Sequence, residues 1–142
     1  MVEQSVEHRT WTVVAALFGA IAVALGAFGS HGLRNCVSSD QLATWRTAVE
    51  YQMFHSIALL ALAANARDRA RWRWSMRLWT SGILLFSGSL YALVLSGIRS
   101  LGIVTPIGGI CFIAGWLSLI CFHRRRESAS SRESVGEPNR LR

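Results

Sequence analysis

Four long apolar runs limit what this sequence can fold into, because each is about as long as a membrane is thick. They occupy residues 11–28, 45–64, 78–97 and 102–122. The hydrocarbon core of a bilayer is roughly 30 Å thick and takes about 20 helical residues to cross. A soluble domain of this size would instead alternate apolar and polar residues at the period of a helix or a strand. We therefore predict an all-α integral membrane protein, a single domain of four transmembrane helices in an up-down bundle.

The first run has one competing explanation, which is a cleaved signal peptide. Arg9 would be its charged start, and residues 27–29 resemble a cleavage site. The apolar part of a signal peptide has about 7–15 residues, and the run 11–28 is longer. We expect it to stay in the protein as the first transmembrane helix.

The second run is the least apolar of the four. Residues 57–64 contain no polar side chain, whereas the first half of the run carries Arg46, Glu50, Gln52 and His55. We interpret the run as one membrane helix whose polar end lies at the outer interface. A soluble amphipathic helix is the alternative.

The positively charged residues are all arginine, and their positions predict an orientation. Twelve of the fifteen lie before the first run, between the second and third, and after the fourth. Cytoplasmic segments of membrane proteins carry an excess of Arg and Lys, so we place both termini in the cytoplasm. The predicted organisation is a cytoplasmic N-terminus (1–10), a transmembrane domain (11–122) and a disordered, basic cytoplasmic tail (123–142).

The same arginines would also fit a protein that binds nucleic acid, since the net charge is +7 and Trp72 and Trp74 alternate with arginines. Arginine and tryptophan beside an apolar run are also typical of the membrane interface. Because apolar runs flank this segment on both sides, we expect the lipid bilayer as the partner and no nucleic acid.

Small residues recur on three of the predicted helices. In lipid, contacts between helices depend on such residues, because they let the backbones approach. The predicted packing positions are Ala15, Gly19, Ala22, Gly26, Gly82, Gly88, Gly108 and Gly115. We interpret them as the packing seam of the bundle rather than the lining of a substrate path.

Two ionisable residues inside the second run are the first candidates for chemistry, because charged groups within a span are costly. Glu50 follows Arg46 by about one helical turn, so an interfacial ion pair would explain both. His55 points about 140° away from Glu50 around a helix, so the two would not share a face. A backbone carbonyl, Ser87 or Ser89 is the expected hydrogen-bond partner of His55.

His31 lies just past the first run, and with Glu50 and His55 it offers ligands for a transition metal. The three residues have no recognised ligand spacing, and the three cysteines form no CxxC motif. We predict no metal and no cofactor, and keep a metal site or metalloenzyme as an alternative. No phosphate loop, nucleophile elbow or zinc-protease motif is present, which weighs against an enzyme.

Four short motifs resemble those of a known family. Residues 26–33 (GAFGSHGL) resemble GAFGAH-x-L, residues 47–55 (TAVEYQMFH) resemble TA-x-EYQ-x-FH, residues 86–91 are FSGSLY, and residues 105–109 (TPIGG) match TP-x-GG. The order and spacing of the motifs also agree, over residues 11–122. On these motifs the chain is similar to the YgdD/YwdK-like family, small bacterial inner-membrane proteins with a domain of unknown function and with eukaryotic relatives.

The resemblance implies a four-helix protein of the bacterial inner (plasma) membrane that keeps its first helix, and it supplies no activity. Ser30 stands where the family commonly has alanine, and the polar tail is unusual. The motifs should converge in the outer half of the bundle, where the first and third helices end and the second and fourth begin. The predicted polar cluster consists of His31, Glu50, Tyr51, Gln52, His55, Ser87, Ser89, Tyr91 and Thr105.

Three functions fit these expectations. The favoured one is a structural or accessory membrane protein, in which the polar cluster locks the helices together. The first alternative is a transporter or channel component for a small solute, ion or proton that uses Glu50 and His55. It would be a homo-oligomer, because four short helices without an inverted repeat are few for a carrier. The second alternative is a membrane metal site or enzyme using His31, Glu50 and His55.

Overall fold

The structure is a computed structural model that describes residues 2–65 and 69–135, with side chains for residues 9–64 and 72–121. The described chain is helical apart from short connections, as predicted. The α-helices are α1 (Val2–Phe28), α2 (Ser39–Asn65), α3 (Arg69–Gly82), α4 (Gly88–Ser96) and α5 (Thr105–Val135). The short turns are two of π-helix, η1 (Gly29–Leu33) and η2 (Ile83–Ser87), and one of 3-10 helix, η3 (Arg99–Ile103).

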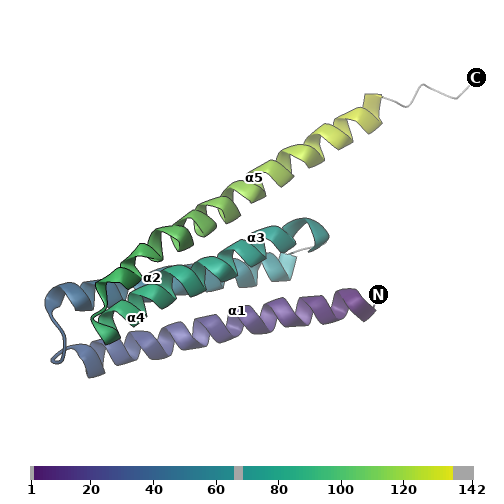
Figure 1. The fold of residues 1–142 in the computed structure, drawn as a ribbon. Coiled ribbons are helices and arrows are strands. Elements are labelled where there is room, and N and C mark those ends of the chain that lie inside the picture. The colour runs from purple at the N-terminus through teal and green to yellow at the C-terminus, as the bar shows by residue number, and fades with distance from the viewer. Residues whose placement is uncertain (1, 66–68, 136–142) are drawn as a thin grey trace, which may run out of the picture.

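These elements form four rods that run up and down the bundle (Figure 1). η1 prolongs α1, and η2 joins α3 to α4 in one rod, since Gly82 and Gly88 on either side of it keep right-handed helical backbone. This rod ends at Gly97, whose φ of 70° is left-handed and whose N–H donates to the Leu93 carbonyl at 2.9 Å. Glycine commonly closes helices in this way. The start of α1 and the end of α5 lie at the same end of the bundle (Figure 1).

The second helix begins earlier than the predicted residue 45, because Ser38 caps it. The Gln41 N–H donates to Ser38 Oγ at 3.2 Å, and the Ser38 N–H donates to Gln41 Oε1 at 3.0 Å. This reciprocal pair is a capping box. Glu50 therefore lies eleven residues after Ser39, about 16 Å along the axis. Glu50 is thus deeper in the helix than the one turn expected from a start at residue 45.

The other predicted helix bounds differ from the observed ones because the helices extend into the neighbouring polar segments. α1 already begins at Val2 rather than at residue 11, and the third rod begins at Arg69 rather than at 78. The fourth span starts with η3, and α5 then continues to Val135. The tail 123–142, predicted to be disordered, is thus helical as far as Val135, and residues 136–142 lie outside the described part of the chain.

Within the described ranges, three helical segments are long and apolar enough to cross a membrane, namely residues 9–33, 72–96 and 99–121. They correspond to three of the four predicted spans. α2 has 27 residues, which is long enough, but it is not among them. Its hydropathy is lowered by the polar residues that the sequence shows in its first two-thirds.

Three of those polar side chains lie inside the bundle. α2 packs against α1 and also against α4, η2 and α3. Gln52, His55 and Ser56 are only 2–4% exposed, whereas Phe54 and Ile57 on the same helix are both 59% exposed. α2 therefore buries part of its polar side chains and exposes some of its large apolar ones.

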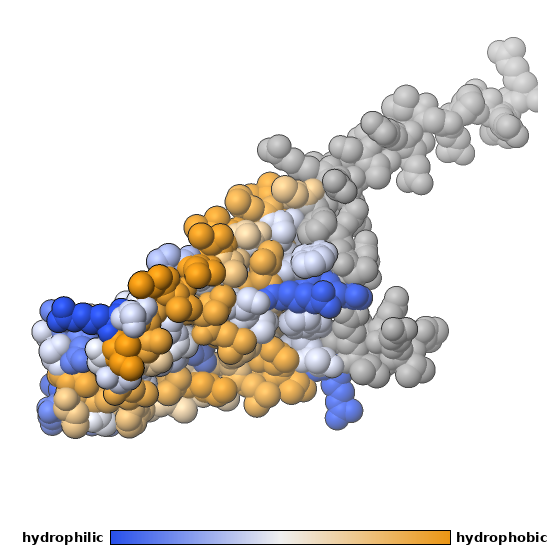
Figure 2. Space-filling model, viewed as in Figure 1, coloured by the Kyte–Doolittle hydropathy of each residue, from blue (hydrophilic) through white to orange (hydrophobic). Residues whose placement is uncertain are grey.

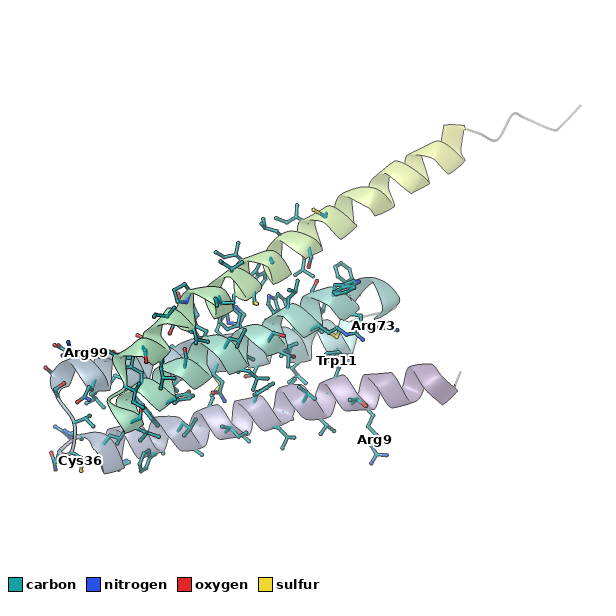
Figure 3. The ribbon with its side chains drawn as sticks, in the orientation of Figure 1. Arg9, Trp11, Cys36, Arg73 and Arg99 are labelled. Carbon is teal, nitrogen blue, oxygen red and sulfur yellow. The ribbon has the colours of Figure 1, made fainter. Side chains whose placement is uncertain are left out.

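The visible face of the bundle is mostly apolar along its middle, and charged side chains lie at the ends (Figure 2 and Figure 3). Figure 2 shows apolar side chains over the middle of the visible face and hydrophilic ones at the end that holds the α1–α2 connection. Arg9 and Arg73 lie at one end of the bundle, and Arg99 lies at the other with Cys36 (Figure 3). A band of this kind is what a bilayer core would cover.

Small residues close two of the helix contacts. Ala15 and Ala22 of α1 are 2% and 0% exposed, and a Cβ added to Gly19 or Gly26 would meet Ser56 or Val49 of α2 at 3.4 Å. These four predicted packing residues therefore face α2.

The contact between α5 and the third rod is closed in the same way. A Cβ on Gly115 would meet the Trp79 ring at 2.5 Å, and one on Gly82 would collide with the Phe112 ring. A Cβ on Gly108 would collide with the backbone of Phe86. Gly88 is the exception among the predicted packing positions, because a Cβ there would meet nothing within 4 Å.

Candidate functional site

Gln52 lies at the centre of the polar contacts between helices. Its amide Nε2 donates to the Phe18 carbonyl of α1 at 2.9 Å, and its Oε1 accepts a bond from the Tyr91 hydroxyl of α4 at 3.1 Å. One buried side chain of α2 thus joins three rods. Bonds of this kind are the main polar contacts available to helices in lipid.

Hydroxyl pairs join the third rod to α5. Ser89 Oγ and Thr105 Oγ1 lie 2.8 Å apart, and Ser89 Oγ also donates to the Phe86 carbonyl at 3.0 Å. Nearer the other end of the rod, the Ser75 and Ser118 hydroxyls lie 2.5 Å apart. Each of these pairs places two polar groups against each other instead of against lipid.

His55 is held in one neutral form by two bonds. Its Nδ1 lies 2.8 Å from the Tyr51 carbonyl, which only accepts, so this nitrogen carries the hydrogen. Its Nε2 lies 3.3 Å from the indole N–H of Trp116, which only donates, so this nitrogen carries none. The ring also stacks on Phe112 at 3.6 Å between centroids, with an angle of 12° between the planes.

The partners of His55 were predicted only in part. A backbone carbonyl was one expected partner, and the Tyr51 carbonyl fills that place. Neither expected serine does so, because Ser89 is bonded to Thr105. The hydroxyl of Ser87 is fully buried and has no hydrogen-bond partner among the described residues.

Glu50 is exposed, and the predicted ion pair with Arg46 is absent from the described part of the chain. Glu50 instead lies on a groove between α2, η2 and α5 with a volume of about 520 Å³. The groove is lined by Glu50, Tyr51, Phe54, His55, Phe86, Gly109, Phe112, Ile113 and Trp116. Glu50 and His55 were expected to face different directions, and the groove nevertheless takes in both.

Rings form most of the groove wall. The Tyr51 ring stacks on Phe86 at 4.5 Å between centroids, and the Phe54 ring lies 5.9 Å from Trp116. Tyr51, Phe54 and Trp116 are 39–59% exposed, so the groove is open at the side of the bundle. The π-turn η2 contributes Phe86, and π-turns within α-helices are frequent at functional sites.

The remaining candidates are distributed over the bundle. The segments 47–55, 86–91 and 105–109 are brought together, through Gln52 with Tyr91, Tyr51 with Phe86, and Ser89 with Thr105. His31 is exposed on η1, and no described hydrogen bond or ring contact joins it to Glu50 or His55. Within the described residues, no three His, Cys, Asp or Glu side chains are grouped as a metal site requires.

Sequence reasoning missed half of the groove, because its α5 side is apolar. Phe112 and Trp116 are four residues apart, a spacing that places both rings on one face of a helix. That spacing was the available signal. The bond from the Trp45 indole to the Leu25 carbonyl, at 2.9 Å, was missed as well.

Comparison with known proteins identifies relatives along most of the chain. Residues 25–109 match the family model described as a protein of unknown function, DUF423. A UPF0382 membrane protein of Haemophilus influenzae is 49% identical over 110 residues, which are 77% of this chain and 89% of that protein. A UPF0382 membrane protein of Staphylococcus aureus is 43% identical over 113 residues, 79% of this chain and 93% of the relative.

The resemblance that the four motifs indicated is confirmed by a further relative. The UPF0382 inner membrane protein YgdD of Escherichia coli is 42% identical over 114 residues, 79% of this chain and 87% of that protein. No solved structure matches this chain. The chain therefore belongs to the DUF423 family, whose members are membrane proteins of unknown function.

Proposed function

We propose that this chain is a structural or accessory protein of the bacterial inner membrane, which it crosses four times with both termini in the cytoplasm. Gln52 is the observation that carries the proposal, because its buried amide is bonded to both α1 and α4. The hydroxyl pairs between the third rod and α5 extend the same pattern. A network whose polar groups satisfy one another fixes one arrangement of helices.

α2 would be the fourth crossing. With 27 residues it is about 40 Å long, which exceeds the hydrocarbon thickness. Gln52, His55 and Ser56 are buried, whereas Phe54 and Ile57 are exposed. A span of this kind is less apolar than a lipid-surrounded helix, because some of its polar residues face protein.

The orientation is supported by the arginines. Arg9 and Arg73 lie at the end of the bundle where α1 begins and α5 ends (Figure 3). Cytoplasmic segments carry the excess of positive charge, so this end would face the cytoplasm. The inner membrane is supported by the Escherichia coli relative, which is named as an inner membrane protein.

A double-mutant cycle on the Gln52–Tyr91 bond tests the structural role. The variants are Gln52→Leu, Tyr91→Phe and the double variant, and the free energy of unfolding is measured in detergent. We expect a coupling energy of about 1 kcal/mol, since hydrogen bonds between membrane helices are worth about 0.6–1.7 kcal/mol.

The matched control is Ser96→Ala, whose exposed hydroxyl donates to the Ala92 carbonyl at 2.6 Å and accepts from the Ile98 N–H at 3.2 Å, so that neither bond reaches another rod. The coupling energy between Ser96→Ala and Gln52→Leu should be too small to measure. A coupling of zero between Gln52 and Tyr91 would contradict a polar network that holds the rods together.

A second function is favoured by the position of Glu50. Glu50 lies on an open groove together with His55, which suits an oligomeric transporter or channel component for a small solute, ion or proton. Flux into liposomes that contain the wild type, and its loss in Glu50→Gln, would support this function. The metal alternative is not proposed, because His31, Glu50 and His55 form no such group among the described residues.

A further inference from the structure

The groove lies near the middle of the membrane-crossing segments. Phe86 lies ten residues before the end of the segment 72–96, and Gly109 lies ten residues after the start of 99–121. Each is therefore about 15 Å from the nearer end of its span. Glu50 lines the same groove, so in the proposed four-span arrangement, on which this inference rests, it would lie at a similar depth within the hydrocarbon.

A carboxylate at this depth needs a compensating partner. Charged side chains inside a membrane are costly, and those that occur are paired or mark the path of a substrate. Among the described side chains, Glu50 forms no ion pair. The arginines labelled in Figure 3 lie at the two ends of the bundle instead of beside the groove.

The rest of the groove suits a positive and apolar ligand. Tyr51, Phe54, Phe86, Phe112 and Trp116 line it, and the faces of aromatic rings attract cations. A groove of about 520 Å³ is large enough for a small molecule. It opens between exposed apolar side chains such as Phe54 and Ile113, so a ligand can enter from the lipid phase.

We propose that this groove binds a hydrophobic organic cation, such as a quaternary ammonium or phosphonium, with Glu50 as the counter-ion and the rings as its walls. An acyl chain would leave the Glu50 carboxylate without a partner. A metal ion would find one carboxylate and no further group of ligands among the described residues. A second copy of the chain would present its own apolar surface to Glu50.

The test is a binding measurement with tetraphenylphosphonium on the purified full chain in detergent. We expect the wild type to bind this cation and Glu50→Gln to bind it at least tenfold more weakly. Asp40→Asn is the matched control, since Asp40 is an exposed acid in the first turn of the same helix, and it should bind like the wild type. Tetraphenylborate has the same shape and the opposite charge, and it should not compete.

The aromatic wall is tested in the same way. Phe54→Ala removes an exposed ring from the groove and should weaken binding several-fold, whereas Leu60→Ala, 42% exposed on the same helix outside the lining, should not. Both variants should unfold at the same temperature as the wild type, because neither side chain is buried.

Three results would overturn the proposal. One is a wild type that binds no tetraphenylphosphonium, including the case in which it is a stable dimer whose groove is covered by the second copy. Another is Glu50→Gln binding as tightly as the wild type. The third is tetraphenylborate binding equally well, which would make the groove merely apolar.

Discussion

α5 meets its neighbours in two different ways. Towards α3 and η2 the contact is close, because Gly108 lies against the Phe86 backbone and Gly82 and Gly115 leave room for the rings of Phe112 and Trp79. Towards α2 the contact consists of side chains, chiefly His55 stacked on Phe112 and bonded to Trp116. α5 also leans away from the other rods along its length (Figure 1).

The difference shows how a small bundle can hold a groove. Glycines bring two rods into contact along one side of α5, and large rings keep the other side apart from α2. Close packing gains dispersion energy that lipid cannot replace. The closed side therefore holds the helix in place, while the open side leaves room for the groove.

The largest expected effect on stability comes from adding a side chain where the helices leave no space for one. Gly108→Ala places a Cβ against the Phe86 backbone, and backbone cannot move aside as a side chain can. We expect a loss of about 3 kcal/mol in the free energy of unfolding. The neighbouring Gly109→Ala is the control, because its Cβ would meet only Phe86 Cδ2, at 3.9 Å. Equal losses in the two variants would show that α5 is not closed on one side only.

A smaller loss of stability is expected on the open side, where α5 faces α2. His55→Ala removes a buried ring, its stack on Phe112 and its bond to Trp116. We expect about 2 kcal/mol of destabilisation. His31→Ala, an exposed histidine on η1, serves as the control and should change little. A fully stable His55→Ala would mean that the rings do not hold α2 and α5 at their distance.

The smallest expected loss of stability comes from a variant that removes the hydrogen bond between Trp116 and His55 but keeps an aromatic ring at position 116. Trp116→Phe keeps an aromatic side chain but removes the indole N–H that His55 Nε2 accepts. The expected loss is less than about 1 kcal/mol. Nitrogen NMR of His55 should show the Nδ1–H form in the wild type and a mixture in the variant. Trp74→Phe, 61% exposed, is the control and should leave the His55 signals unchanged.

The sequence was sufficient to predict the helices that carry uninterrupted apolar runs. Hydropathy over 72–96 and 99–121 depends on composition alone, which a chain shows without its fold. The start of α2 was missed by six residues because it depends on the side-chain bonds between Ser38 and Gln41. That error placed Glu50 too close to the start of the helix.

The hydrogen-bond partner of His55 within its own helix could be predicted from the sequence. Partners that come from a different helix could not. The motifs contain Gln52, Tyr91, Ser89 and Thr105, but they did not show that Gln52 pairs with Tyr91 and Ser89 with Thr105. The partner of His55 on α5 is Trp116, an aromatic residue in an apolar run, and nothing in composition separates it from a lipid-facing one. Relative rotation of helices decides such contacts, and it emerges only from packing.

The location of the two termini tests most directly whether α2 crosses the membrane. In a variant without native cysteines, a single cysteine replaces Ser5 or Ser128, or Cys36 alone is restored, and an impermeant maleimide is applied to spheroplasts. Four crossings with cytoplasmic ends predict labelling of Cys36, which is exposed in the α1–α2 connection, and no labelling of the other two before the membrane is opened. Three crossings would place the termini on opposite sides, so that labelling of only one of positions 5 and 128 in intact spheroplasts would contradict the four-span bundle.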